Sequence, residues 1–203
     1  MNSRAYPPPL QRLIDELARL PTIGPRSAER MALFLLNAPK EQTQALAQAM
    51  LAARQGIGRC AECHYFADQA VCPICAQKSV RQKQMCVVEY PQDVMAVEYT
   101  GKYKGLYYVL WGCLSPLDNT GPQDLPLRQL IERVQREGIE EVILATGSSR
   151  EGEATALYVR QILQPLKIKI SRIARGIPVG STLGHSDRAT LAEAMSGRQA
   201  IDR

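Results

Sequence analysis

The chain has no long apolar run. No segment is apolar over enough residues to span a bilayer, and residues 1–9 contain no apolar core of the kind that signal peptides have. We therefore expect a cytoplasmic protein with no membrane association. Because thiols stay reduced in the cytoplasm, structural disulfides are not expected either.

Two further absences limit the chemistry. The sequence has only two histidines, His64 and His185, and no Gly-x-x-x-x-Gly-Lys-Ser/Thr loop that could hold a triphosphate. The nearest match, Gly101-Lys102, is followed by a tyrosine. We therefore predict that the chain has no intrinsic ATPase activity.

Four of the six cysteines form two Cys-x-x-Cys pairs that are separated by eight residues. Each pair can hold one edge of a tetrahedral metal ion, and four thiolates leave no open position for a substrate or water. The spacing therefore predicts a structural Zn²⁺ site. The expected ligands are Cys60, Cys63, Cys72 and Cys75. We interpret the other two cysteines, Cys86 and Cys113, as buried small apolar residues.

The positive charge is concentrated in the N-terminal part of the chain. The net charge is +5, and residues 1–86 hold eleven Lys or Arg against six Asp or Glu, whereas residues 87–203 hold fourteen of each. An anionic partner such as nucleic acid is therefore expected to bind within the first 86 residues. A solvated basic face without a partner is the alternative.

Two helices joined by a short turn are predicted at the start of the chain. Leucine and isoleucine recur at helical spacing over residues 10–20, Pro21 ends this pattern, and Pro25 suits the first position of a second helix. We expect Gly24 to take a backbone conformation that is closed to other residues. A third helix is expected over roughly residues 40–55.

The turn between these helices offers a site for a phosphate group. Free backbone N–H groups at the start of the second helix are expected to face a phosphate oxygen, while Arg26 and Arg30 add positive charge. The segment Leu-Pro-Thr-Ile-Gly-Pro-Arg-Ser-Ala at residues 20–28 is similar to the helix-hairpin-helix of many DNA repair and recombination proteins. The predicted DNA-binding residues are Gly24, Arg26, Ser27 and Arg30.

Beyond the cysteines the pattern changes to short runs that are rich in β-branched residues. Helical patterns over residues 127–137 and 154–163 separate the later runs. This alternation predicts a mostly parallel sheet that is covered by helices on both faces. The expected strands cover residues 87–88, 94–97, 106–110, 142–145 and 168–173.

Functional groups of such sheets gather at the carboxyl ends of the strands. Glu89 follows the first of these runs, and residues 146–153, Thr-Gly-Ser-Ser-Arg-Glu-Gly-Glu, follow another. This loop is similar to the signature of Toprim domains, whose active members hold Mg²⁺ with an Ala-Thr-Asp-x-Asp-Arg-Glu-Gly-Glu stretch and a separate glutamate.

Glu89, Glu151 and Glu153 match carboxylates of the Toprim signature, but Gly147 and Ser149 stand where it has two aspartates. Mg²⁺ needs several oxygen ligands, so this loss weakens metal binding. We therefore expect a Toprim fold without Toprim catalysis.

The order of a helix-hairpin-helix, a four-cysteine motif and a degenerate Toprim signature resembles that of the RecR family of bacterial recombination mediators. The resemblance covers about residues 9–201. Other matching segments are Cys-Val-Val-Glu (86–89), Leu-Ser-Pro-Leu-Asp (114–118), Glu-Gly-Glu-Ala-Thr-Ala-Leu-Tyr (151–158) and Gly-Ile-Pro-Val-Gly (176–180).

The fold that this resemblance implies is α+β with several modules. It consists of an N-terminal helical hairpin, a small four-cysteine zinc module and an α/β Toprim domain with a mostly parallel sheet. The expected regions are 1–55 for helix-hairpin-helix DNA binding, 56–84 for the zinc motif, 85–175 for the Toprim-like domain, and 176–203 for a C-terminal oligomerisation segment with a final helix opened by Asp187.

The function that the resemblance implies is that of a non-enzymatic clamp in recombinational DNA repair. Such proteins form dimers and tetrameric rings, bind double- and single-stranded DNA without sequence preference, and help load the recombinase on gapped DNA with RecO or RecF. The stretch over residues 181–187 departs from the acidic and aromatic residues usual in the family, and Asp187 is its only acidic residue.

We hypothesise that Glu89, Glu151 and Glu153 form an acidic surface for a basic protein partner. Alternatively, Glu151 and Glu153 only stabilise the first turn of a helix. A metal-dependent nuclease or topoisomerase-like enzyme that uses the three glutamates is the alternative function. A sequence-specific zinc reader is disfavoured, because eight residues leave no room for a recognition helix between the cysteine pairs.

Overall fold

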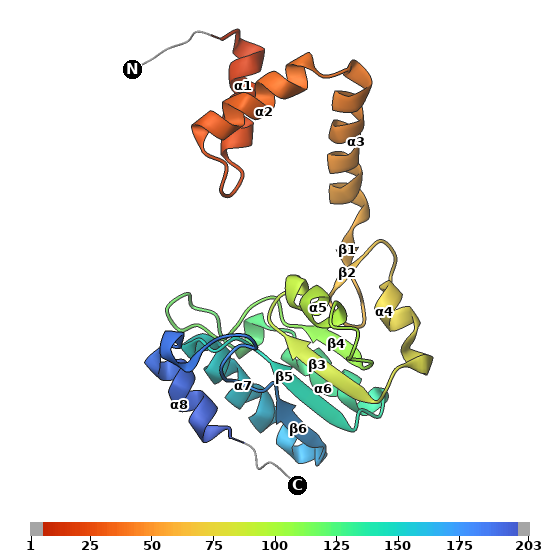
Figure 1. Cartoon of the computed structure of the whole chain (residues 1–203). Coiled ribbons are helices and arrows are strands. Elements are labelled where there is room, and N and C mark those ends of the chain that lie inside the picture. Colours follow the sequence, from red (N-terminus) through yellow and green to blue (C-terminus); the bar gives the residue numbers. More distant parts are fainter. Residues whose placement is uncertain (1–5, 199–203) are drawn as a thin grey trace. The chain divides into compact units, whose positions relative to one another are not determined.

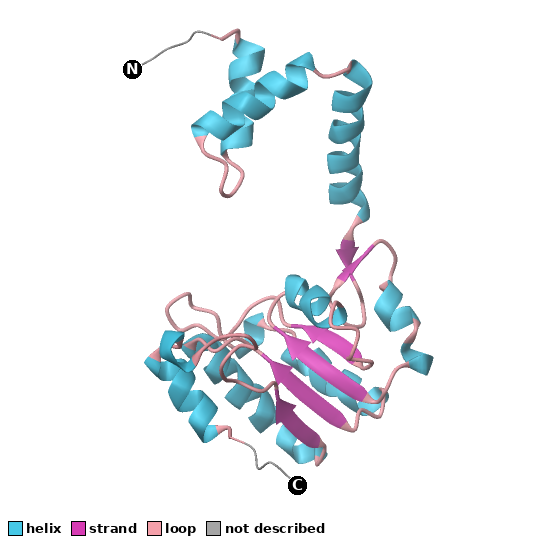
Figure 2. Ribbon diagram, in the orientation of Figure 1, coloured by secondary structure: helices cyan, strands magenta, loops and turns pink. Residues whose placement is uncertain are grey.

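The computed structural model describes residues 6–198 (Figure 1). They belong to two compact units, which divide between Ile57 and Gly58. Figure 2 shows that the described part of the first unit is helical, whereas the strands belong to the second. Residues 1–5 and 199–203, the ends of the predicted first and last regions, lie outside the described residues.

Three helices form the first unit: α1 (Pro8–Ala18), α2 (Pro25–Asn37) and α3 (Lys40–Gly56). α1 and α2 pack together around Ile14, Ala28 and Ala32, and the small alanine side chains let the two helices approach closely. α2 begins with Pro25, where the missing N–H would have had no helical partner. The predicted helical hairpin is therefore confirmed.

A small four-cysteine module begins the second unit. The antiparallel pair β1 (Gly58–Arg59) and β2 (Phe66–Ala67) is followed by the short helix α4 (Pro73–Ala76). Together these elements enclose the cysteines, with Ala67, Tyr65 and Ile74 packed around them.

The remainder of the second unit is built on a four-stranded sheet in the order β4-β3-β5-β6. Every neighbouring pair of strands is parallel. The strands are β3 (Gln84–Val88), β4 (Leu106–Val109), β5 (Glu141–Ala145) and β6 (Lys169–Arg172). The predicted parallel α/β domain is confirmed.

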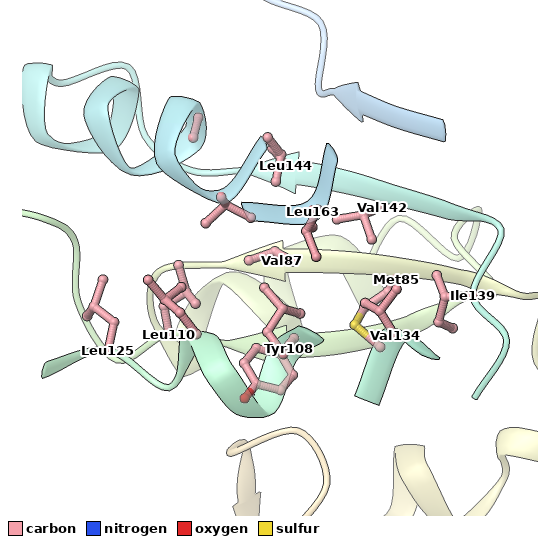
Figure 3. Close-up of a cluster of buried hydrophobic side chains, with 14 of the residues drawn as sticks. Met85, Val87, Tyr108, Leu110, Leu125, Val134, Ile139, Val142, Leu144 and Leu163 are labelled. Atoms are coloured by element: carbon pink, nitrogen blue, oxygen red, sulfur yellow. The ribbon is translucent and has the colours of Figure 1, made fainter. Parts of the chain in front are cut away.

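Helices cover the sheet on both faces. α6 (Leu127–Arg136) and α7 (Arg150–Leu163) pack on one face, and α5 (Pro91–Glu98) packs on the other. Figure 3 shows the first face, where Val87 and Val142 of the strands meet Leu163 of α7. Successive side chains of a strand point to opposite faces, so alternate residues of β3 pack into the apolar cores on the two faces of the sheet.

The strand expected at residues 94–97 is wrong, because these residues lie in α5. Pro91 occupies the first helical turn, and the Asp93 carboxylate accepts a hydrogen bond from the Tyr90 N–H at 2.9 Å. Both features are helix-start signals. Val94 and Val97 are apolar because they pack on the sheet from this helix, not because they belong to a strand.

The described chain ends in α8 (Arg188–Ser196). Asp187 opens this helix as expected, because its side chain accepts hydrogen bonds from the N–H groups of Ala189 and Thr190, both at 2.9 Å. No described residue of α8 is buried. Over residues 6–198, no helix has both the length and the apolar character needed to cross a membrane.

Candidate functional sites

The four predicted zinc ligands meet at one point. Their sulfur atoms all lie within 4.8 Å of one another, and the four residues are buried. The Sγ atoms of Cys63 and Cys72 are 3.5 Å apart. Zn–S bonds of about 2.3 Å place the sulfurs of a tetrahedral zinc site ~3.8 Å apart, so the donor set fits one such ion.

Backbone hydrogen bonds shape the cysteine cluster. The N–H of Cys72 donates to the Sγ of Cys60 at 3.3 Å, and the N–H of Cys60 donates to the carbonyl of Tyr65 at 2.7 Å. A hydrogen bond from the Cys63 thiol lowers the pKa of the Cys72 thiol.

The loop after Cys63 is fastened to the carboxyl end of β4. The N–H of Val109 donates to the Cys63 carbonyl at 2.9 Å, and the Trp111 indole N–H donates to the His64 carbonyl at 2.6 Å. The Tyr108 hydroxyl donates to Pro126, so it accepts from His64 Nε2, 3.0 Å away. His64 is therefore engaged with the sheet and does not replace a cysteine ligand.

Sequence reasoning missed Arg133 of α6. Its Nη2 donates to the Sγ of Cys75 at 3.2 Å, its Nη1 donates to the Tyr107 carbonyl at 2.8 Å, and the side chain is only 2% exposed. The available signal is its position, since Arg133 shares the apolar face of α6 with Leu130 and Val134. Such a charge needs a specific partner.

The proposed phosphate site lies at the start of α2. Gly24 precedes the helix, Pro25 has no N–H, and the first backbone donor to bond within the helix is Ala28. Among the described residues, the N–H groups of Arg26 and Ser27 have no acceptor. These two donors are available to an anion at a helix end that also attracts negative charge.

Gly24 does not take a backbone conformation that is closed to other residues, so that expectation is wrong. Its φ of −79° and ψ of 166° are open to any residue, and the left-handed residue of the turn is Thr22, with a φ of +66°. A Cβ at Gly24 would meet no atom within 4 Å. The glycine therefore leaves open space at the helix start.

The predicted basic residues of the hairpin are accessible. Arg26 and Arg30 are exposed, and neither forms an ion pair with another described residue. Ser27 is half-buried between them. The structure thus brings Gly24, Arg26, Ser27 and Arg30 together at one helix end, and their contact with DNA remains a prediction.

Glu89 and the loop after β5 form the Toprim-like edge of the sheet. The Glu89 carboxylate accepts a hydrogen bond from the N–H of Gly147 at 2.8 Å. Ser149 caps α7 by accepting from the N–H of Gly152 at 3.1 Å. Thr146 donates to the Gly152 carbonyl at 2.9 Å. Hydrogen bonds within the loop and to Glu89 therefore hold residues 146–152 in place.

The three predicted glutamates do not share one environment. Burial raises the pKa of the Cys113 thiol, and the negative charges of Glu89 and Glu151 raise it further, so both carboxylates lie near this thiol. Glu153 instead pairs with Arg172 and Arg175. The expected acidic surface therefore rests on Glu89 and Glu151, because the charge of Glu153 is offset.

No carboxylate cluster for a metal ion forms at this edge. Within residues 6–198, the four cysteines are the only group of three or more His, Cys, Asp or Glu side chains placed to share one ion. The carboxylate of Glu89 instead accepts a hydrogen bond from the backbone, and that of Glu153 accepts one from an arginine.

Family models match four consecutive segments of the chain. The matches are the RecR helix-hairpin-helix at residues 10–54, the RecR four-cysteine zinc finger domain at 57–77, the Toprim domain at 83–174 and the RecR C-terminal region at 176–199. The zinc-finger match and the geometry of the four thiols agree, and the predicted Zn²⁺ cofactor is confirmed.

Curated relatives match over nearly the whole chain. A protein of Deinococcus radiodurans is 48% identical over 98% of this chain and 89% of its own length. Proteins of Rippkaea orientalis and a Cyanothece species are 44% and 45% identical over 97% and 98% of this chain, and the match spans 100% of each of them. All three bear the name "Recombination protein RecR".

Proposed function

This chain belongs to the RecR family, and on that premise we propose that it is a non-enzymatic DNA-binding clamp of recombinational repair. It binds double- and single-stranded DNA without reading the sequence, and it acts in the cytoplasm with RecO or RecF to load the recombinase on gapped DNA. Its curated relatives are named recombination proteins, which supports the role in recombinational repair.

The observation that carries DNA binding is the open start of α2. Two backbone N–H groups without acceptors lie beside Arg26 and Arg30, which are exposed and form no ion pair with another described residue. Donors of this kind contact phosphate oxygens, which are the same for every base sequence. Binding is therefore expected to depend on salt and not on sequence.

The test replaces both Arg26 and Arg30 with alanine and compares binding to several unrelated DNA sequences across a salt series. Arg54→Ala is the matched control, because Arg54 is also exposed and lies on α3 of the same unit. The double variant is expected to bind every sequence more weakly and to lose about 0.9 of the logarithmic salt slope per lost phosphate contact. Unchanged affinity, or a new sequence preference, would contradict the proposal.

The absence of enzymatic activity is part of the proposal. It is supported by the engagement of Glu89 with Gly147 and of Glu153 with two arginines, since carboxylates that hold Mg²⁺ need free oxygens directed at the ion. The test incubates the protein with supercoiled plasmid and Mg²⁺ or Mn²⁺. Nicking that disappears in Glu153→Gln would establish the metal-dependent nuclease instead.

Self-association is the third element of the proposal. Large apolar side chains of α2 and α3 remain exposed, and no described residue of α3 is buried within this chain. The exposed residues include Phe34, Leu36, Met50 and Leu51. An apolar surface of this kind is typical of a protein interface and supports a dimer or a tetrameric ring.

Light scattering after size exclusion tests self-association. Leu51→Glu is expected to reduce the assembled mass, because it places a charge in the apolar surface of α3. Gln48→Glu adds the same charge at another exposed position of that helix and is expected to leave the mass unchanged. A monomeric parent protein, or an assembled mass that Leu51→Glu leaves unchanged, would contradict the proposed self-association.

A further inference from the structure

The buried guanidinium of Arg133 has too little carboxylate to balance it. Arginine stays protonated under all ordinary conditions, so the charge is permanent. Among the described residues, the only carboxylate within 4 Å is that of Glu62, and its Oε2 lies 3.7 Å from Arg133 Nε. That nitrogen has no hydrogen-bond acceptor in the described chain. Glu62 also pairs with the exposed Arg136 and therefore does not serve Arg133 alone.

The remaining counter-charge is supplied at the metal centre. Arg133 Nη2 lies 3.2 Å from the Sγ of Cys75, which is one of the four ligands. One Zn²⁺ with four thiolates leaves a net charge of minus two in a buried site, and this charge also needs a partner. The two unbalanced charges therefore meet where Arg133 reaches Cys75.

A second hydrogen bond of Arg133, to the backbone of β4, orients its guanidinium toward Cys75. Arg133 Nη1 donates to the carbonyl of Tyr107 in β4 at 2.8 Å, so the planar guanidinium is oriented by the sheet while Nη2 reaches the sulfur. Its two helix neighbours Arg128 and Arg136 are exposed and make no comparable contact with the cysteines. Of these three arginines of α6, only Arg133 is both buried and hydrogen-bonded to a cysteine of the cluster.

We propose that Arg133 is a positioning residue of the zinc centre. It donates a hydrogen bond to the zinc-bound thiolate of Cys75 and balances part of the negative charge of the site. Retention of zinc thereby depends on α6 and β4 of the Toprim domain, and the stability of that domain depends in turn on zinc. The four-cysteine module and the Toprim domain are then one energetic unit.

The first test measures zinc transfer to a chromogenic chelator. Arg133→Met keeps an unbranched side chain but removes the charge and the donors, and outer contacts of this kind typically change metal affinity by about 10- to 100-fold. We expect faster transfer of that order, a smaller increase for Arg133→Lys, and no change for Arg128→Met on the same helix. Equal rates in all variants would overturn the proposal.

The second test separates positioning from simple packing. Melting temperatures of the parent and of Arg133→Met are compared with zinc bound and after chelation under reducing conditions, as a thermodynamic cycle. With zinc bound the substitution is expected to destabilise. Without zinc Arg133 loses the charged metal centre that balances it, so the substitution is expected to cost less stability than it does with zinc bound. An equal loss in both states would show that Arg133 only packs.

The third test is spectroscopic and uses Co²⁺ in place of zinc. A hydrogen bond to a thiolate lowers the energy of its lone pairs, so its loss is expected to move the thiolate-to-cobalt charge-transfer band to longer wavelength. Arg133→Lys is measured alongside Arg133→Met, which keeps the test decisive if the methionine variant fails to fold. An unshifted band in a folded variant would overturn the proposal.

Discussion

The Glu89 carboxylate accepts a hydrogen bond from the backbone N–H of Gly147, and the two atoms are 2.8 Å apart. Glu89 follows β3 and Gly147 follows the neighbouring β5, so this bond joins two strand ends. A Cβ at position 147 would lie 3.5 Å from both oxygens of Glu89. An aspartate there would place a second carboxylate beside the first, which is favourable only with a cation between them. With glycine at position 147, the Glu89 carboxylate accepts a hydrogen bond from the loop backbone without a second carboxylate beside it.

The first prediction concerns Gly152, which the same loop surrounds. A Cβ at this position would lie 2.5 Å from the Gly147 carbonyl oxygen and 2.8 Å from Glu89 Oε1. Gly152→Ala is therefore expected to lower the free energy of unfolding by about 1–3 kcal/mol, because the loop backbone must shift. Thermal unfolding measures the effect, at roughly 2–4 °C per kcal/mol for a chain of this size.

Gly24→Ala is the control for Gly152→Ala. A Cβ at Gly24 would contact nothing within 4 Å, and its φ of −79° is open to alanine. The melting temperature of this variant is expected to stay near that of the parent. Equal stability of the two alanine variants would show that the crowding at Gly152 is relieved at no cost.

Much of the fold follows from the sequence because local signals and burial agree there. At three features the local preference of the sequence agrees with the tertiary packing. They are the two cysteine pairs, the proline at the start of α2, and the strands that alternate with α6 and α7. The strand predicted at residues 94–97 failed because an apolar run of that length fits a buried helix face as well as a strand. Pro91 and Asp93 were the signals that separate the two readings.

The sites were only partly predictable. The cysteine ligands follow from their spacing alone, but the pairing of Glu153 with Arg172 and Arg175 depends on how β6 lies beside α7. The contact between Arg133 and Cys75 joins residues 58 positions apart in the chain. Spacing rules describe neighbours in sequence, and such contacts exist only once the sheet is assembled.

The second prediction is a pH dependence that originates at Glu98. Arg81 donates two hydrogen bonds to the Glu98 carboxylate, at 3.0 and 3.1 Å, and the Tyr107 hydroxyl donates a third at 2.8 Å. The Arg81 hydrogen bonds lower the pKa of Glu98 below its ordinary value of 4.5. Because the pKa is lowered in the folded state, the stabilisation is present above the unfolded-state pKa and is lost as the pH falls through the folded-state pKa.

Glu98→Gln is therefore expected to cost about 2 kcal/mol at neutral pH and to flatten the loss of stability below about pH 4.5. Denaturant unfolding across the acid range measures the difference from the parent. Glu132→Gln is the control, because Glu132 forms an exposed pair with Arg128 on the surface of α6. Identical acid profiles for the parent and Glu98→Gln would contradict the prediction.

The third prediction concerns the metal itself. Cys60→Ser is expected to lose zinc and stability together, because the four-cysteine module has little apolar core besides its ligands. Native mass spectrometry should find one zinc per chain in the parent protein. Chelation should lower the melting temperature of the parent but not that of Cys60→Ser.

Cys86→Ser provides the control for the metal prediction. Cys86 is buried like the ligands, but it lies in β3 and is not part of the four-cysteine cluster. This variant is expected to keep its zinc and its response to the chelator. A metal-free Cys60→Ser protein with parental stability would show that the site is not structural.

The last prediction separates Glu151 from Glu153 in binding a partner. Glu151 is half-buried, lies near the Cys113 thiol and forms no ion pair with another described residue, so we expect its charge to be available to a basic protein. Glu151→Gln is expected to weaken binding to a RecO-like protein about tenfold, which is about 1.4 kcal/mol, with stability and DNA affinity nearly intact. Glu153→Gln removes the partner of Arg172 and Arg175 and is expected to cost about 1 kcal/mol of stability instead.

Titration calorimetry with the partner and thermal unfolding of each variant distinguish these two roles. The pair is a matched test, because both glutamates lie in the first turn of α7 and lose the same charge near the same helix end. A loss that came only from the helix dipole would therefore be equal in both variants and would leave partner binding unchanged. If Glu151→Gln lowers the melting temperature but not the partner affinity, the partner surface lies elsewhere on the chain.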